Sequence, residues 1–133
     1  MIQKITLRMD SNLRFTPTDE RSLGELNPKE LLLYATADCA GHTIVGLLKE
    51  HIISVGSMEI SIEGTLTTPT VVAESRYSHF NIIYRIEFNT LKDQVIISRA
   101  VNLAHDKYCG MIQMLRRIAP LTHETSIVAT GNS

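Results

Sequence analysis

The chain has two cysteines, Cys39 and Cys109, and these are its strongest candidates for covalent chemistry. A thiolate is a nucleophile that a peroxide oxidises to a sulfenic acid. A thiol is mostly protonated at neutral pH unless a cation or a helix dipole lies beside it. His42 follows Cys39 by three residues and shares its face of a predicted helix, so it is a candidate for such a cation, although a surface or hydrogen-bonded histidine is the more common interpretation. A buried cysteine is more often a small apolar side chain, and both interpretations stay open at this point.

Other residues with versatile chemistry give weaker signals. Cys39 and His42 form a Cys-x-x-His pair, but no second pair at metal-site spacing accompanies them, so we predict neither a metal site nor a cofactor. Met111 and Met114 fit core packing, with the lining of an apolar pocket beside Cys109 as the alternative. The remaining histidines are scattered and are predicted to lie at the surface: His51, His79, His105 and His123.

A long helix over residues 27–52 is predicted to position Cys39. Asn27 is a good N-cap, Pro28 suits the first helical position, and Glu30 can close a capping box. Such a helix spans roughly 37 Å, about the width of a globule of this chain length. Its apolar residues fall on all sides of the axis, and a single small sheet cannot cover them. We therefore predict that a second chain helps to bury this helix.

Shorter elements surround that helix. Alternation of apolar and polar residues predicts strands, and Thr90 with Asp93 predicts the start of an amphipathic helix that runs to about His105. A further short helix over 110–118 stops before Pro120. The inner face of the amphipathic helix is predicted to hold Leu91, Val95, Val101 and Ala104. The predicted strands cover residues 2–9, 12–18, 58–66, 71–80, 82–88 and 122–130. This pattern indicates an α+β fold with an antiparallel sheet.

Composition narrows the class of protein. At 133 residues the chain is the size of one domain, predicted over residues 1–133. Its 13 Lys and Arg against 14 Asp and Glu leave a net charge of −1, with no run of like charges, so we expect no nucleic-acid partner. The sequence has no uninterrupted apolar run of about 18 residues and no signal-like start, so we expect no membrane partner and a cytoplasmic protein with reduced thiols.

From Asn27 onward the chain resembles the OsmC/Ohr family, and two segments carry the resemblance. "NPKELLLYATADC" is similar to the Asn-Pro-Glu-Glu-Leu segment that leads to the first cysteine of the family, and "YCGMIQML" is similar to the segment around its second. The C-terminal part is most similar to the YhfA-like branch. The resemblance implies an OsmC-like fold, in which two chains form an intertwined homodimer and their sheets wrap around long central helices.

The resemblance also implies a reaction. In the peroxidases of the family the first cysteine, here Cys39, attacks a hydroperoxide, and the second, here Cys109, resolves the sulfenic acid as a disulfide that an external dithiol reduces. An arginine from the N-terminal strands usually supplies the cation. Arg14 is the first candidate for that role and Arg8 the second.

Three positions depart from the peroxidase pattern. Lys29 replaces a glutamate, which removes the carboxylate partner expected for the arginine; Asp38 replaces the usual alanine, and Gly110 replaces a proline. A carboxylate beside the sulfur disfavours the thiolate. The alternative function is therefore a non-catalytic OsmC-like dimer that binds a small apolar ligand in the dimer cleft.

Overall fold

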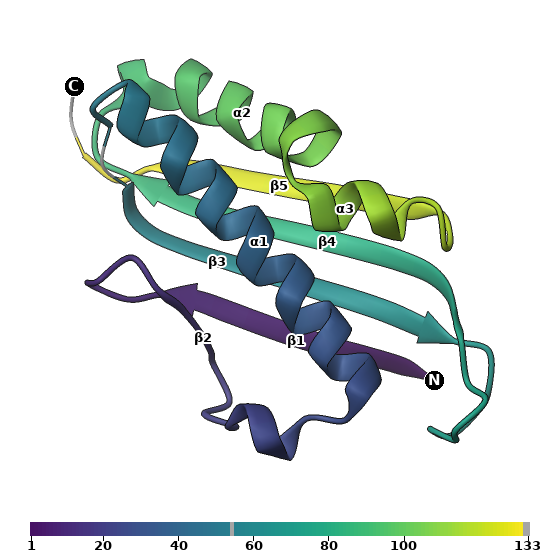
Figure 1. Ribbon diagram of the computed structural model, residues 1–133. Coiled ribbons are helices and arrows are strands. Elements are labelled where there is room, and N and C mark those ends of the chain that lie inside the picture. The colour runs from purple at the N-terminus through teal and green to yellow at the C-terminus, as the bar shows by residue number, and fades with distance from the viewer. Residues whose placement is uncertain (54, 132–133) are drawn as a thin grey trace.

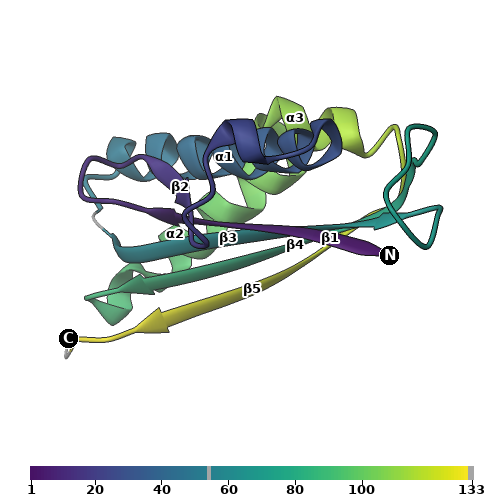
Figure 2. The ribbon, with the colours of Figure 1, turned by 90° about the horizontal axis from the view of Figure 1, so that it is seen from below.

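Five strands form one sheet, and the three α-helices all lie against one face of it (Figures 1 and 2). This arrangement is seen in a computed structural model that describes residues 1–53 and 55–131. The strand order is β2-β1-β3-β4-β5. The elements are β1 (Ile2–Met9), β2 (Phe15–Pro17), α1 (Pro28–Glu50), β3 (Val55–Leu66), β4 (Tyr77–Phe88), α2 (Gln94–Leu103), α3 (Gly110–Leu115) and β5 (Leu121–Ala129).

The caps predicted for the long helix are present. The Asn27 side chain accepts a hydrogen bond from the Glu30 backbone N–H at 2.8 Å, and the Glu30 carboxylate accepts one from the Asn27 N–H at 3.1 Å. The helix ends at Glu50, two residues earlier than predicted. There Ile52 adopts a left-handed φ of 55°, and the Ile53 N–H donates back to the Leu48 carbonyl.

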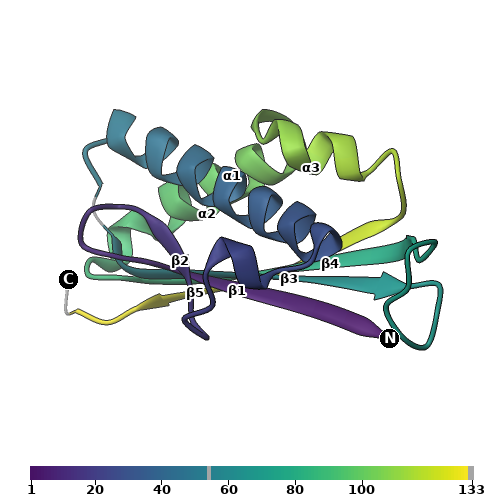
Figure 3. The ribbon, with the colours of Figure 1, turned by 60° about the horizontal axis from the view of Figure 1, so that its bottom comes forward.

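One side of α1 faces the sheet, and Figure 3 shows the helix lying across the strands. The residues on this side recur every three or four positions and are fully buried: Leu33, Ala37, Ala40, Ile44 and Leu48. The opposite side keeps apolar residues in contact with solvent, with Leu31 36% exposed and Ala35 and Gly46 exposed. A single chain therefore covers only part of this apolar helix. Within the described residues, α1 also has the length and apolarity of a membrane span, a test that core helices pass as well.

The central strands follow the predicted alternation. Met58, Ile60 and Ile62 of β3 are fully buried, and β3 pairs antiparallel with both β1 and β4. The separate strand predicted within residues 71–80 is wrong. Residues 71–76 belong to the loop between β3 and β4, and the rest of that segment is the start of a longer β4 that begins at Tyr77.

The α+β class is confirmed, but one strand pair differs from the antiparallel prediction. Strand β5 runs parallel to β4. The chain between these two strands passes through α2 and α3, and a helical crossover of this length returns the chain to the sheet in the same direction. The pair extends the sheet beneath these two helices (Figure 1).

The helix predicted from Thr90 is wrong in its start and in the first half of its inner face, whereas Val101 and Ala104 are buried as predicted. No side-chain cap forms at Thr90, and a short 3-10 turn, Leu91–Asp93, precedes α2. Leu91 is 55% exposed and Val95 is 77% exposed. The buried side of α2 and of the turn after it consists of Ile97, Ala100, Val101 and Ala104.

Candidate functional site

The two thiols meet although 70 positions separate them. The sulfur atoms of Cys39 and Cys109 lie 3.2 Å apart, and both cysteines are free. A disulfide has a sulfur separation of about 2.05 Å, so an approach of about 1 Å joins them. This contact makes the pair the candidate functional site.

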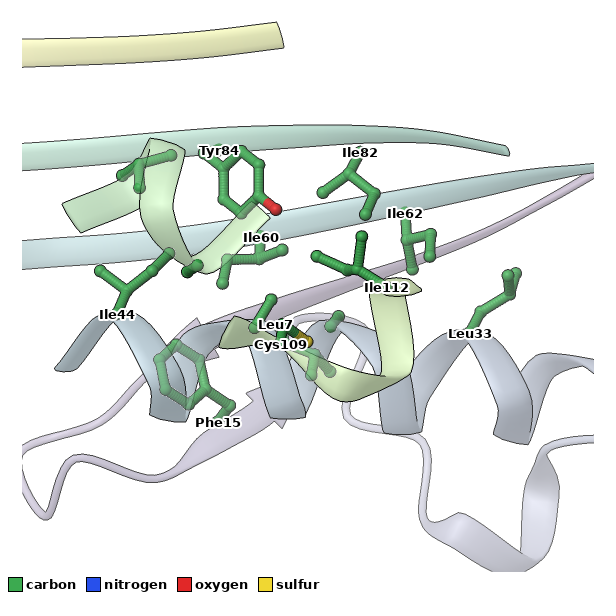
Figure 4. Close-up of a cluster of buried hydrophobic side chains, with 14 of the residues drawn as sticks. Leu7, Phe15, Leu33, Ile44, Ile60, Ile62, Ile82, Tyr84, Cys109 and Ile112 are labelled. Carbon is green, nitrogen blue, oxygen red and sulfur yellow. The ribbon is translucent and has the colours of Figure 1, made fainter. Parts of the chain in front are cut away.

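Two helices hold the pair in place. Cys39 lies near the middle of α1, on a flank that is half-buried, and Cys109 is the N-cap of α3 and is fully buried. Between α2 and α3 the helix widens into a π-helical turn, Ala104–Tyr108, which ends as the Cys109 N–H donates to the Ala104 carbonyl at 2.9 Å. Turns of this kind are frequent at functional sites. Figure 4 shows Cys109 among the buried side chains between α1 and the sheet.

The environment distinguishes the two thiols. Burial raises the pKa of the Cys109 thiol to about 12, although the backbone N–H groups of Ile112 and Met111 favour its thiolate. Cys109 is therefore protonated at neutral pH. Cys39 is the more accessible of the two thiols.

The charged neighbours of Cys39 along α1 pair with each other. His42 Nε2 lies 3.3 Å from the Asp38 carboxylate, and the His42 ring packs edge-on against Phe15 with ring centroids 5.4 Å apart. The His42 side chain is 52% exposed. This geometry favours a surface histidine beside a carboxylate over a histidine that contacts the thiolate.

Neither N-terminal arginine candidate contacts Cys39 within the described residues. Arg14 is exposed in the turn between β1 and β2, where its backbone N–H donates to Asp10, and its role stays a prediction. Arg8 alternates with a buried leucine along β1, and its guanidinium lies 3.6 Å from Glu59 on the open face of the sheet. It therefore points away from α1, and the structure does not support Arg8.

A different arginine, missed in the sequence, is held by carboxylates. Arg21 donates to Asp19 at 2.8 Å and to Glu30 at 3.0 Å, and the hydrogen bond to Glu30 is the main cause of its raised pKa. Glu30 thus supplies the carboxylate that we expected Lys29 to remove. The sequence signal for this pair was Glu30, the acidic residue next to Lys29. Glu30 precedes Cys39 by nine residues, about 13 Å along the helix axis, and among the described residues the hydrogen bonds of the Arg21 side chain go to Asp19 and Glu30.

The prediction that His105 lies at the surface is wrong. Its side chain is 2% exposed, and the Tyr84 hydroxyl is hydrogen-bonded to His105 Nδ1 at 2.9 Å. Burial, with the charges of His123 and Arg116, lowers the pKa of His105 to about 4, so the imidazole is neutral. The His123 ring lies 3.9 Å from it, centroid to centroid. Figure 4 shows Tyr84 in the same buried cluster as Cys109.

Two further predictions concern methionine and metal. Met111 packs partly against the core, whereas Met114 is 56% exposed, so core packing is wrong for Met114. Within residues 1–53 and 55–131, no three His, Cys, Asp or Glu side chains gather as metal ligands would.

The chain resembles known proteins both in its sequence and in this fold, a five-stranded sheet with its helices on one face. The chain belongs to the OsmC family, described as OsmC-like protein, whose profile matches residues 19–124. It is 27% identical over 103 residues to Protein YhfA of Escherichia coli K12, covering 77% of this chain and 74% of that protein.

Solved structures share the fold. The OsmC-like protein of Mycoplasma pneumoniae superposes with a TM-score of 0.62 at 13% identity, covering 96% of each chain. The organic hydroperoxide resistance protein OhrB of Bacillus subtilis gives 0.53 at 18% identity, covering 95% of this chain and 98% of that one. These likenesses confirm the predicted OsmC-like fold.

Proposed function

We propose that this chain is a cysteine-dependent hydroperoxide reductase that acts in defence against oxidative stress, with Cys39 as the peroxidatic and Cys109 as the resolving cysteine. The observation that carries the proposal is the 3.2 Å contact between the sulfurs of two free cysteines, one half-buried and one fully buried. The membership of this chain in the OsmC family, and its shared fold with the organic hydroperoxide resistance protein OhrB, support the proposal.

The reaction follows from the different surroundings of the thiols. The Cys39 thiolate attacks the terminal oxygen of a hydroperoxide; the O–O bond breaks, the sulfur becomes a sulfenic acid, and the alkoxide leaves as an alcohol after it takes a proton. Cys109 then attacks that sulfur, its thiol proton leaves with the displaced hydroxide as water, and a disulfide remains. An external dithiol returns both sulfurs to thiols by exchange.

The high pKa of Cys109 fits the resolving role. A protonated, fully buried thiol competes poorly for a dissolved oxidant but is positioned to react once a sulfenic acid forms 3.2 Å away. Cys109 then loses its proton in the step that forms the disulfide.

A titration of thiols tests the proposal. A slight excess of cumene hydroperoxide should remove both thiols from the native protein and form an intramolecular bridge between Cys39 and Cys109. Cys109→Ser should stop at a sulfenic acid that dimedone traps on Cys39, and Cys39→Ser, the matched control, should consume no peroxide above background. Thiols that stay reduced until the protein unfolds would refute the reductase and favour a dimer that binds a ligand without turning it over.

Four substitutions test which cation stabilises the Cys39 thiolate. We propose Arg14 as the residue that stabilises the thiolate, so Arg14→Gln should slow peroxide consumption about tenfold, whereas Arg8→Gln should leave it unchanged. Because Glu30 already pairs with Arg21, Lys29→Glu should change the rate less than twofold. Loss of activity in Arg21→Gln, with Arg14→Gln unaffected, would transfer the role to Arg21.

We also propose an intertwined homodimer in the cytoplasm. The apolar side of α1 that the chain leaves open supports the dimer, and the free thiols suit a reducing compartment. An obligate pair of this kind buries more than about 2,000 Å². Sedimentation should show a dimer at micromolar concentration, and a stable folded monomer there would contradict this part of the proposal.

A further inference from the structure

A hollow of about 530 Å³ lies where the start of α1, the loop between β3 and β4, and the residues after α3 come together. This volume is in the range of small-molecule sites. Its lining combines two cations, Lys29 and Arg76, with apolar surface from Leu32, Tyr77 and Ile118. Among the described residues no Asp or Glu lines it. The thiol pair lies elsewhere, since neither cysteine lines the hollow.

The two cations at the hollow keep donors available. Lys29 Nζ donates to the backbone carbonyls of Val72 at 3.1 Å and Ala73 at 3.5 Å, which leaves one of its three N–H groups unused. The Arg76 side chain is exposed, and in the part of the chain that the structure describes no carboxylate lies within ion-pair distance of it. A guanidinium presents two parallel N–H groups that match a carboxylate.

The nearby carboxylates do not cancel this positive charge. Glu30 is close enough to contribute to the raised pKa of Tyr77, but its carboxylate is paired with Arg21 at 3.0 Å. Glu74 belongs to the loop between β3 and β4, where it is exposed, and it does not line the hollow. The hollow therefore combines unmatched positive charge with apolar walls.

We infer that this hollow binds a small amphiphilic carboxylate. The carboxylate accepts hydrogen bonds from Arg76 and Lys29, and the apolar body lies against Leu32, Tyr77 and Ile118. A neutral molecule of the same shape loses the ionic contacts, and a cationic one is repelled. The inference does not depend on the proposed thiol chemistry, because it uses neither cysteine and needs no oxidant.

Calorimetry with decanoate and the reduced full-length protein tests this inference. Decanoate should bind, decanol should bind at least tenfold more weakly, and decyltrimethylammonium should not bind. Raising the salt concentration should weaken only the binding of decanoate. Lys29→Gln with Arg76→Gln should weaken it about tenfold, as expected for two partly exposed charge contacts.

A matched control removes the same two charges on the other side of the sheet. Lys4 and Arg85 are exposed on its open face and do not line this hollow, so Lys4→Gln with Arg85→Gln should leave decanoate affinity unchanged. Methyl NMR signals of Leu32 and Ile118 should shift on titration with decanoate. Equal binding of decanol, an equal loss of affinity in the control, or shifts confined to other methyl groups would overturn the inference.

Discussion

Acid should destabilise this protein through His105, the buried neutral histidine that is hydrogen-bonded to Tyr84. In the unfolded chain a histidine has a pKa near 6.5, whereas burial, followed by the charges of His123 and Arg116, lowers that of folded His105 to about 4. Asp106 acts in the opposite direction with a smaller effect. Between these two values the unfolded chain binds a proton that the folded chain does not, so stability falls as the pH falls through this window.

The magnitude follows from the two pKa values. The gap between 6.5 and about 4 corresponds to about 3 kcal/mol of unfolding free energy, of which about 2 kcal/mol is lost by pH 5. Surface carboxylates titrate mainly below that pH, near 4. Urea unfolding followed by circular dichroism at intervals from pH 7.5 to pH 5 therefore reports mainly on the histidines, and a variant at position 105 identifies the contribution of His105.

The variant His105→Asn separates this titration from packing. Asparagine keeps an acceptor close to the position of Nδ1 for the Tyr84 hydroxyl but has no proton to gain in this range. At pH 7.5 the variant should be less stable by roughly 1–2 kcal/mol because ring atoms are lost from the core, and its stability should stay nearly level down to pH 5. His123→Gln, which removes a neighbouring charge, should retain most of the slope. An equally steep slope in His105→Asn would refute the reasoning.

Further predictions concern single positions of the backbone. A Cβ added at Gly41 meets the Phe15 ring at 2.5–2.7 Å, so Gly41→Ala should destabilise the protein by about 1–3 kcal/mol. A Cβ at Gly46 in the same helix meets no atom of its own chain, so Gly46→Ala should be less destabilising than Gly41→Ala by about 1 kcal/mol or more. Paired thermal melts test both, and an equal effect of the two substitutions would contradict the packing. Ile52 is 95% exposed with φ 55°, so Ile52→Gly should stabilise by about 0.5–1 kcal/mol, with Ile52→Ala near neutral as the control. Destabilisation by glycine there would mean that the left-handed turn costs nothing.

Elements that are fixed by residues close in the sequence, such as the start of α1 and strand β3, were predicted from local patterns. The start of α1 follows from hydrogen bonds between residues three apart at Asn27 and Glu30, and β3 follows from its alternation. The parallel pairing of β5 depends on the path of the whole connection through α2 and α3, which brings the chain back to the edge of the sheet beside β4. The rule for helical crossovers would have predicted it.

The candidate site was predictable only in part. The resemblance led to Cys39 and Cys109, but their contact spans 70 positions, and no local pattern reports such a distance. His105 was missed because histidine is a polar type. Its spacing was the signal, since Ile97, Val101 and His105 recur every four residues and share the buried side of the helix. Arg21 was missed because one of its partners, Glu30, lies nine positions further along the chain, in the first turn of α1.

The contact between residues 39 and 109 has a consequence for folding stability. A covalent bond there would close a loop of about 70 residues that contains β3, β4 and α2, and so restrict most of the unfolded chain. Chain-entropy arguments assign about 4 kcal/mol to a loop of this size, a large share of the stability of an ordinary domain. A molecule that has met an oxidant would then resist unfolding and proteolysis more than one that has not, and would keep this difference until a reductant opens the bridge.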